Sequence, residues 1–262
     1  MWPSFSTELG EQTIHLPFYI ILVAAGICHI IIGVDSRARK EGFAIEGIGK
    51  CTNAILIAIL GGGLVTWSLT PFLYSGPKFW GPISAMPGII GGLAIFSLAI
   101  KRYRLDIWKH LNLIAPFVCF AHAWGRLGCF SAGCCHGQPT SSFLGMHFHP
   151  TSPAYGQFGD APLHATQLYE AALLLALGWI LINRCPPAMR FAYYTLAYGC
   201  GRFLLEFIRG DDRGAIFNIT ILSPSQILSL GYIAFGLGLI FRFRNHSDGL
   251  PEKHLITPHP PM

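Results

Sequence analysis

Seven long apolar stretches, separated by shorter polar segments, constrain this 262-residue chain more than any other feature. Each has about 15 to 22 residues, and a helix needs roughly 20 residues, with a range of about 17 to 25, to cross the hydrocarbon core of a bilayer. Only 12% of the residues are charged, whereas roughly a quarter are charged in an ordinary soluble domain. The sequence therefore predicts an all-α, polytopic membrane protein with about seven transmembrane helices. The stretches cover residues 16–34, 52–73, 82–100, 111–125, 167–183, 191–208 and 225–241.

The positive charges are concentrated on one side of the predicted membrane. Of the 18 Lys and Arg residues, 13 lie in segments 35–50, 101–110 and 184–190 and in the tail after residue 241. By the positive-inside rule, this asymmetry predicts an N-terminus outside and a C-terminus in the cytoplasm. Because the basic residues belong to these membrane-flanking segments, the net charge of +5 does not indicate a nucleic-acid partner.

The polar segments outside the apolar stretches divide the chain further. Residues 1–247 are predicted to form one transmembrane domain, and residues 1–15 contain no Lys or Arg, unlike a cleavable signal peptide. The longest connection, at about 126–166, is rich in Gly, Pro, His and Cys, and a loop of this length is commonly functional. We expect it to form a structured cap on the outer side. Residues 248–262 are expected to form a disordered cytoplasmic tail.

Two charged residues lie inside the sixth apolar stretch. Arg202 and Glu206 are four residues apart and so face the same side of a helix. A charge at the bilayer centre costs roughly 2.5 to 3.5 kcal/mol on insertion scales, so such residues usually face a cavity or a substrate path. The alternative is an ion pair that fastens two helices together. Glu170, near the start of the fifth stretch, is either a similar functional residue or one that extends to the outer interface.

Arg126 follows the fourth apolar stretch and lies among four glycines, Gly125, Gly128, Gly133 and Gly137. Glycines permit tight turns whose peptide N–H groups can converge on an anion, and arginine suits phosphate because it offers forked donors that stay charged. The alternative is an arginine that anchors the helix end at the lipid headgroups. Arg209 and Arg213 would add positive charge at the same outer depth.

Cysteine and histidine are concentrated at the start of the predicted cap, in Cys129, Cys134, Cys135 and His136. Metal coordination is one interpretation, but a structural zinc site normally shows two pairs of ligands at short spacing. A disulfide from Cys129 to Cys134 or Cys135, or plain thiols, is favoured over a metal. No metal and no cofactor are therefore expected.

Four sequence blocks resemble those of the prolipoprotein diacylglyceryl transferase family. The first reads Gly125-Arg126-Leu127-Gly128-x-Phe130-x-x-Gly133-x-x-x-Gly137, and the second His164-Ala165-Thr166-Gln167-Leu168-Tyr169-Glu170. The third reads Tyr198-Gly199-x-x-Arg202-Phe203-x-x-Glu206-Phe207-x-Arg209 and is followed by Ser225-Gln226-Ile227-Leu228-Ser229. The order and spacing of the blocks agree with the family, and the resemblance covers most of the chain.

The chain departs from the family pattern at several positions. Cys129 stands where the family usually has Asn, and Cys134 where it has an acidic residue. Pro87-Gly88-Ile89 corresponds to a His-Gly-Gly segment of the family, and Pro17 stands where a Tyr follows the N-terminal histidine. A histidine usually regarded as functional is thus missing.

The resemblance implies an enzyme of lipoprotein biosynthesis in the bacterial inner membrane. Its donor would be phosphatidylglycerol, and its acceptor the lipobox cysteine thiol in the signal peptide of a prolipoprotein, with glycerol phosphate released. Arg126 and Arg202 would hold the phosphate, and His136 or His164 would act as the base. The substrate-binding residues would be Gly125, Gly128, Gly133, Gly137, Gln167, Tyr169, Glu170, Glu206 and Arg209. The alternatives are a divergent paralogue with another acceptor, or a non-enzymatic membrane protein with a Cys/His metal or redox site.

Overall fold

Seven long helices make up most of the protein in the computed structural model, which describes residues 4–9, 12–75, 86–211 and 222–247. Each of the seven apolar stretches overlaps one of these helices, although residues 82–85 of the third stretch lie outside the described residues, so the mostly helical fold is confirmed. The predicted tail at 248–262 lies outside the described residues. The helices are α1 (Phe18–Lys40), α2 (Ile45–Ser75), α3 (Met86–Arg102), α4 (Ile107–Ala132), α6 (Thr166–Asn183), α7 (Arg190–Leu205) and α8 (Pro224–Ser247).

Five of these helices are long and apolar enough to cross a membrane by themselves. They are α1, α2, α4, α6 and α8. The other two are shorter, with 17 residues in α3 and 16 in α7, and α7 also carries Arg202 near its end. A polytopic membrane protein is therefore established.

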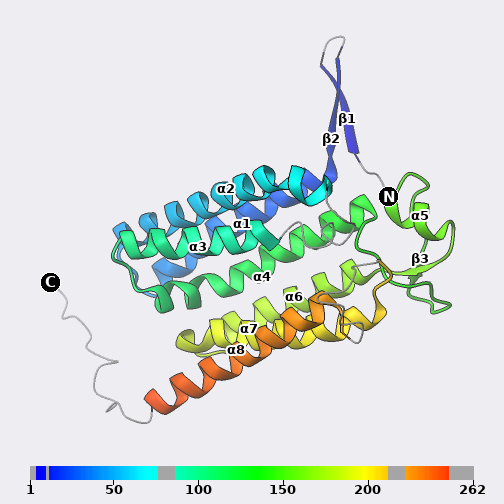
Figure 1. The fold of residues 1–262 in the computed structure, drawn as a ribbon. Helices are drawn as coiled ribbons and strands as arrows, with labels where there is room; N and C mark the ends of the chain where they lie inside the picture. The colour runs from blue at the N-terminus through cyan, green and yellow to red at the C-terminus, as the bar shows by residue number, and fades with distance from the viewer. Residues whose placement is uncertain (1–3, 10–11, 76–85, 212–221, 248–262) are drawn as a thin grey trace.

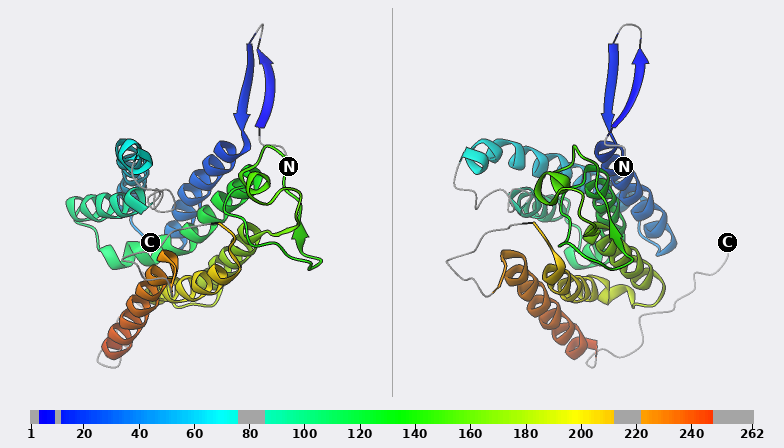
Figure 2. Two further views of the ribbon diagram at one scale, coloured as in Figure 1. Left: turned by 45° about the vertical axis from the view of Figure 1, so that its right-hand side comes forward. Right: turned by 90° about the vertical axis from the view of Figure 1, so that its right-hand side faces the viewer.

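The helices form two groups, and α4 contacts both (Figure 1). On one side, α4 packs against α1. The buried apolar cluster on this side includes Val34 on α1, Ile55 on α2, Ile100 on α3 and Leu113 on α4. On its other side, α4 packs against α6 and α7, and α8 lies outermost on α7 (Figure 2). The residues on α4 therefore lie between the two halves of the bundle.

The surface of the bundle carries many large apolar side chains. On α2, Leu60, Leu64 and Trp67 are each at least 65% exposed and lie on one helical face. Such a surface is unfavourable in water but is matched by lipid chains, whose apolar environment needs no polar cover. These side chains are therefore expected to face the hydrocarbon.

Helix α4 continues further than expected from the sequence, which predicted a span ending near residue 125. Asp106 caps its first turn by accepting a hydrogen bond from the Lys109 N–H at 2.7 Å. Gly133 ends it in the left-handed conformation, with φ of 68°, which glycine adopts at little cost. Arg126 thus lies inside the helix rather than at the start of the loop.

The start of α7 is attached to the N-terminal half of the bundle by two polar side chains. Asn112 on α4 accepts a hydrogen bond from the Phe191 N–H at 2.8 Å, which supplies a partner that α7 lacks from its own first turn. Arg190 donates to the Leu181 carbonyl at 3.0 Å and to the Glu41 carboxylate at 2.7 Å. These contacts join α4, α6 and α7 at the end of the bundle opposite the cap.

The segment after Gly133 forms a cap with little regular structure. It contains the paired strands β3 (Gly145–Met146) and β4 (Leu163–His164) and the short helix α5 (Pro153–Phe158). Phe148, Ala154 and Leu163 form its small buried core. This part of the chain, which begins after α4 rather than at residue 126, therefore has a small core of its own.

A two-stranded hairpin precedes α1 and was not anticipated in the all-α prediction. Strands β1 (Ser4–Leu9) and β2 (Gln12–Pro17) pair antiparallel, with Ser4 opposite Pro17 and Leu9 opposite Gln12. The hairpin projects away from the helices on the side of the cap (Figure 1).

Candidate active site

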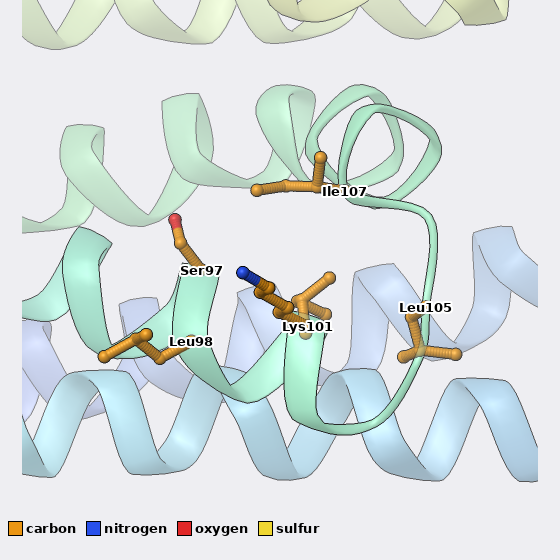
Figure 3. A pocket seen from close by; sticks show the side chains of 6 residues that line it. Ser97, Leu98, Lys101, Leu105 and Ile107 are labelled. Carbon is orange, nitrogen blue, oxygen red and sulfur yellow. The ribbon is translucent and has the colours of Figure 1, made fainter.

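A hollow of about 290 Å³ lies where α3 turns into α4, but only two of its lining side chains, Ser97 and Lys101, are polar. Figure 3 shows its apolar lining around the single amine of Lys101. Its lining residue Ile107 begins α4, and Arg126 lies 19 residues later, which is roughly 28 Å along a helix. The hollow is therefore separate from the polar residues predicted to act on substrate. It is lined by Ser97, Leu98, Ile100, Lys101, Leu105 and Ile107.

Three helices meet at the carboxylate of Glu170. Arg126 on α4 lies 3.0 Å from Glu170 Oε1, and the hydroxyl of Tyr198 on α7 donates to the same oxygen at 2.9 Å. Arg126 Nε also donates to His122 Nε2, one turn earlier on α4, at 3.2 Å. Glu170 is only 1% exposed, so it does not extend to the interface. The ion pair explains how α4 can carry Arg126 inside the bundle.

A second ion pair lies one turn beyond Tyr198. Arg202 Nη2 is 2.6 Å from Glu206 Oε2 and donates to Ser225 Oγ on α8 at 3.0 Å. Ser223 holds the other carboxylate oxygen of Glu206 at 2.7 Å. Arg202 Nη1 is buried and has no hydrogen-bond partner among the described residues. One donor of this guanidinium is thus available for an anionic ligand.

Arg209 connects the end of α7 to the cap. Its guanidinium makes a bidentate contact with Asp211 at 2.8 and 2.9 Å. Burial alone lowers the pKa of Arg209, but the Asp211 carboxylate outweighs this effect and raises the pKa above its ordinary value. Arg209 therefore stays charged. Arg213, which the sequence placed on the same positive rim, lies outside the described residues.

Gly137 lies where the cap meets the residues that follow α7. Its N–H donates to the His164 carbonyl at 2.8 Å, and it forms an isolated β-bridge with Arg209. A Cβ at Gly137 would lie 2.7 Å from the Ile208 carbonyl oxygen and 2.8 Å from that of His164. These are backbone atoms, so the position requires glycine.

The other three predicted glycines differ in their surroundings. A Cβ at Gly128 would lie 2.9 Å from the Tyr19 ring, and one at Gly133 would lie 2.5 Å from Ser152 Cβ. A Cβ at Gly125 would meet no described atom within 4 Å. Gly128 and Gly133 therefore allow close packing, whereas the space beside Gly125 is open.

Three cysteine sulfurs lie together at the start of the cap. The Sγ atoms of Cys129, Cys134 and Cys135 all lie within 4.8 Å of one another. Hydrogen bonds from Cys129 and Cys134, aided by the Arg209 guanidinium, hold the pKa of the Cys135 thiol well below its usual range. Gln167 donates to the Cys134 carbonyl at 2.6 Å, so it positions this loop.

The two candidate bases have different environments. His136 is 2% exposed, packs against the rings of Phe148 and Phe158, and has its Nδ1 3.2 Å from the Gly137 carbonyl. His164 is half-buried, and its Nδ1 lies 3.2 Å from the Tyr169 hydroxyl. His164 is thus the more accessible of the two.

Sequence reasoning missed several members of this site. His122 and Tyr198 each lie one helical turn before a predicted arginine, so spacing on the helix could have indicated them. Asp211 lies only two residues after Arg209, so nearness in the sequence could have indicated it as well. Ser223 follows no such pattern, because only the fold brings it to Glu206.

The helices and the buried charges together define a polytopic membrane protein with an arginine and carboxylate cluster at one end of its bundle. Residues 6–242 match the family model described as "Prolipoprotein diacylglyceryl transferase", and the chain belongs to this family. It is 32% identical over 243 residues to a phosphatidylglycerol–prolipoprotein diacylglyceryl transferase of Clostridium tetani, covering 86% of this chain and 93% of the relative. It is 26% identical over 230 residues to transferase 2 of that name in Clostridium perfringens, covering 84% and 88%. A Francisella tularensis relative with the same name is 29% identical over 247 residues, covering 87% and 88%.

Proposed function

We propose that this protein transfers the diacylglyceryl group of phosphatidylglycerol to the lipobox cysteine thiol of prolipoprotein signal peptides. A sulfur–carbon bond forms at the glycerol carbon, the carbon–oxygen bond to phosphate breaks, and glycerol phosphate leaves with the electron pair. The reaction needs a thiolate, because a free thiol has a pKa of about 8.5, and cations that stabilise the charge developing on the phosphate.

The observation that carries the proposal is the unused donor of Arg202. This guanidinium is 7% exposed, and its Nη1 has no partner among the described residues. A buried donor without a partner costs about 1 to 3 kcal/mol, and a phosphate oxygen would remove that cost. Its neighbour Glu206 fixes the other nitrogen, so the free donor keeps a defined direction.

Arg126 supplies the second cation of the proposed phosphate site. Tyr198 and Glu170 connect it to α7, on which Arg202 lies one turn further along. The Glu170 carboxylate, which both Arg126 and Tyr198 contact, holds Arg126 in place. Gly137 lets the cap approach the end of α7. We propose that Gly125 leaves room for the lipid beside Arg126, since the space next to it is open.

Proton removal from the acceptor thiol is assigned to a histidine of the cap. His164 is the better placed of the two candidates, because it is half-buried and its ring meets the Tyr169 hydroxyl. His136 is enclosed by aromatic rings and would require the cap to open. Gln167 and Arg209 support the reaction by fixing the loop and the rim of the site.

Seven spans with the N-terminus outside complete the proposed arrangement. The basic ends of α1, α3 and α8, together with the α6–α7 connection, lie at the end of the bundle away from the cap (Figure 1). The positive-inside rule then puts the cap on the outer side of the inner membrane, where secreted signal peptides emerge.

The test uses the purified full chain in detergent with phosphatidylglycerol and a lipobox peptide. The expected result is a rise in peptide mass of one diacylglyceryl unit, with release of glycerol phosphate. A peptide with Ser in place of the lipobox Cys and a lipid with a zwitterionic headgroup are the matched controls. Release of glycerol phosphate without any peptide modification would instead indicate a paralogue with a different acceptor.

The phosphate site is tested by Arg126→Ala and Arg202→Ala in a bacterial strain depleted of its own transferase. Neither variant is expected to support growth, although both should be found in the membrane in normal amounts. Full complementation by each of the two single variants would exclude the proposed phosphate site.

A further inference from the structure

The cysteine cluster at the start of the cap has a geometry that the proposed transferase mechanism does not use. Cys129 belongs to the last turns of α4, whereas Cys134 and Cys135 follow the helix end at Gly133. The left-handed turn at Gly133 brings the chain back, and the Cys134 N–H donates to the Cys129 carbonyl at 3.1 Å. Three sulfurs from seven consecutive positions therefore converge within 4.8 Å.

Hydrogen bonds to backbone carbonyls hold this loop in place, and one of them uses a sulfur, since the Cys134 thiol donates to the Cys129 carbonyl at 3.7 Å. Gln167 donates to the Cys134 carbonyl at 2.6 Å, and Thr166 donates to the Cys135 carbonyl at 2.8 Å. Cys135 also adopts φ of 62°, a conformation that costs energy for a residue with a side chain and is concentrated at functional sites. The surrounding fold thus maintains the converged arrangement.

The sulfur spacing suits one metal ion. Zinc binds thiolates at about 2.3 Å in tetrahedral geometry, which puts two sulfurs on the same ion roughly 3.8 Å apart. The three Sγ atoms reach that spacing by shifts of an ångström or less from their limit of 4.8 Å. A disulfide needs about 2.05 Å between two sulfurs and leaves the third unpaired.

The charges around the cluster also suit a metal bound by three thiolates. Such a centre with a divalent ion carries one net negative charge. The Arg209 guanidinium acts electrostatically on the Cys135 thiol, and Arg126 lies one turn before Cys129 on α4. Both guanidinium groups are therefore close enough to balance that charge.

We propose that Cys129, Cys134 and Cys135 bind one thiophilic divalent metal ion, with zinc as the expected ion. Thiolate ligands and tetrahedral geometry favour zinc over magnesium, calcium or manganese. The sequence alone favoured a disulfide or free thiols, because it showed no second ligand pair, and the convergence of the three sulfurs changes that preference.

The proposed centre has an open fourth position. Among the described residues, no histidine or carboxylate joins the three sulfurs in a common group. Catalytic zinc sites characteristically keep one position for water or substrate. The half-buried state of all three cysteines leaves a path for an external ligand.

The fourth ligand is inferred to be the acceptor thiol, and this step rests on the proposed function. A thiol that coordinates zinc loses its proton, which passes to water or to a nearby histidine. The thiolate would then form the sulfur–carbon bond as the carbon–oxygen bond to phosphate breaks, and the arginines would hold the glycerol phosphate that leaves with the electron pair. The metal would thus help to deprotonate the acceptor thiol in a chain that lacks a histidine usually regarded as functional in the family.

The first experiment measures metal in the full chain purified in detergent under reducing conditions without chelators. We expect about one zinc per chain, and after exchange with cobalt we expect the intense sulfur-to-cobalt absorption of a thiolate site. Cys129→Ser, Cys134→Ser and Cys135→Ser should each weaken zinc binding at least tenfold. The matched control is Cys200→Ser, which alters an exposed cysteine on α7. Circular dichroism and gel filtration identify any variant that fails to fold.

Two results would overturn the metal site. One is the absence of zinc and cobalt binding in a folded chain whose three thiols react with an alkylating reagent. The other is a mass 2 Da lower, with a disulfide among these cysteines that persists when zinc is supplied during growth.

The second experiment tests the open position with the cobalt form. A lipobox peptide should shift the cobalt spectrum, and the same peptide with Ser in place of Cys should not. An unchanged spectrum would exclude thiol coordination. Zinc binding without any lipid transfer would leave the metal site standing and reject the proposed function, whereas undiminished transfer by metal-free protein would remove the metal from the reaction.

Discussion

Helix α7 carries two buried arginines, one at each end, and their environments differ. Arg190 is 1% exposed and donates to the Leu181 carbonyl and the Glu41 carboxylate. Arg202 is 7% exposed and contacts Glu206 and Ser225, but its Nη1 has no partner among the described residues. No nitrogen of Arg190 is left buried and unpartnered in this way within the described part of the chain.

The comparison separates two uses of a buried guanidinium. At the start of α7, Arg190 joins α7 to α6 and to the turn after α1, so its charge holds the bundle together. Near the end of the same helix, the contacts of Arg202 orient the group and leave one donor free. Burial of a charge inside a membrane protein therefore does not by itself indicate function, whereas an unused donor does.

The largest expected effect distinguishes the two arginines by activity. Arg202→Gln should lower the rate of diacylglyceryl transfer by about 10²- to 10³-fold, because one preorganised group that stabilises the developing charge is lost. Arg190→Gln should leave the rate per folded molecule within about twofold. Peptide mass spectrometry under single-turnover conditions measures both rates. Equal losses in the two variants would remove the distinction.

The next effect concerns stability at the start of α7. Glu41→Ala leaves Arg190 without its carboxylate, and breaking a buried ion pair from one side costs about 3 to 5 kcal/mol. We expect a loss near 3 kcal/mol, because Glu41 is 18% exposed. Thermal unfolding in detergent gives the change, with Glu46→Ala, at an exposed pair on α2, as the control. A loss as small as that of the control would show that this pair does not fasten the helices.

The sequence predicted the bundle well but could not identify these partners. Hydropathy located all seven helices, because an apolar stretch of that length has few other structures available. Spacing alone paired Arg202 with Glu206. The partner of Arg126 is Glu170, which is 44 positions away, and the partner of Arg190 is Glu41, just after the end of α1. Pairs of this kind depend on helix packing, which local patterns do not contain.

A smaller effect is expected at the junction of α6 and α7. Tyr198→Phe removes the hydroxyl that donates to Glu170, and a hydrogen bond to a charged group contributes about 1.5 to 3 kcal/mol. We expect stability to fall by about 1.5 kcal/mol and transfer to slow moderately, since Arg126 loses part of its support. Tyr193→Phe, also on α7, is the control. An unchanged unfolding temperature would show that the Tyr198 contact is of little consequence.

The smallest effect on stability is expected at Gly125. Alanine there meets open space and raises helix propensity by up to about 1 kcal/mol, so the unfolding temperature should stay equal or rise slightly. If lipid occupies that space, the apparent affinity for phosphatidylglycerol should fall in the same variant. Gly137→Ala serves as the contrast, because its Cβ would collide with two backbone carbonyls. A fall in the stability of Gly125→Ala would contradict the open space.

The hydrogen bond between Asn112 and Phe191 has a consequence for the depth of the arginines in the membrane. Helices α4 and α7 run in the same direction from this contact (Figure 1). At 1.5 Å per residue, Arg126 lies about 21 Å beyond Asn112, and Arg202 lies about 16 Å beyond Phe191. The hydrogen bond of the Asn112 side chain, at the far end of the bundle, thus sets the depths of the two guanidinium groups in the membrane to within about one helical turn of each other. A sliding of α7 by one turn away from the cap would widen this difference to about 10 Å, and a single phosphate would then be less able to meet both cations.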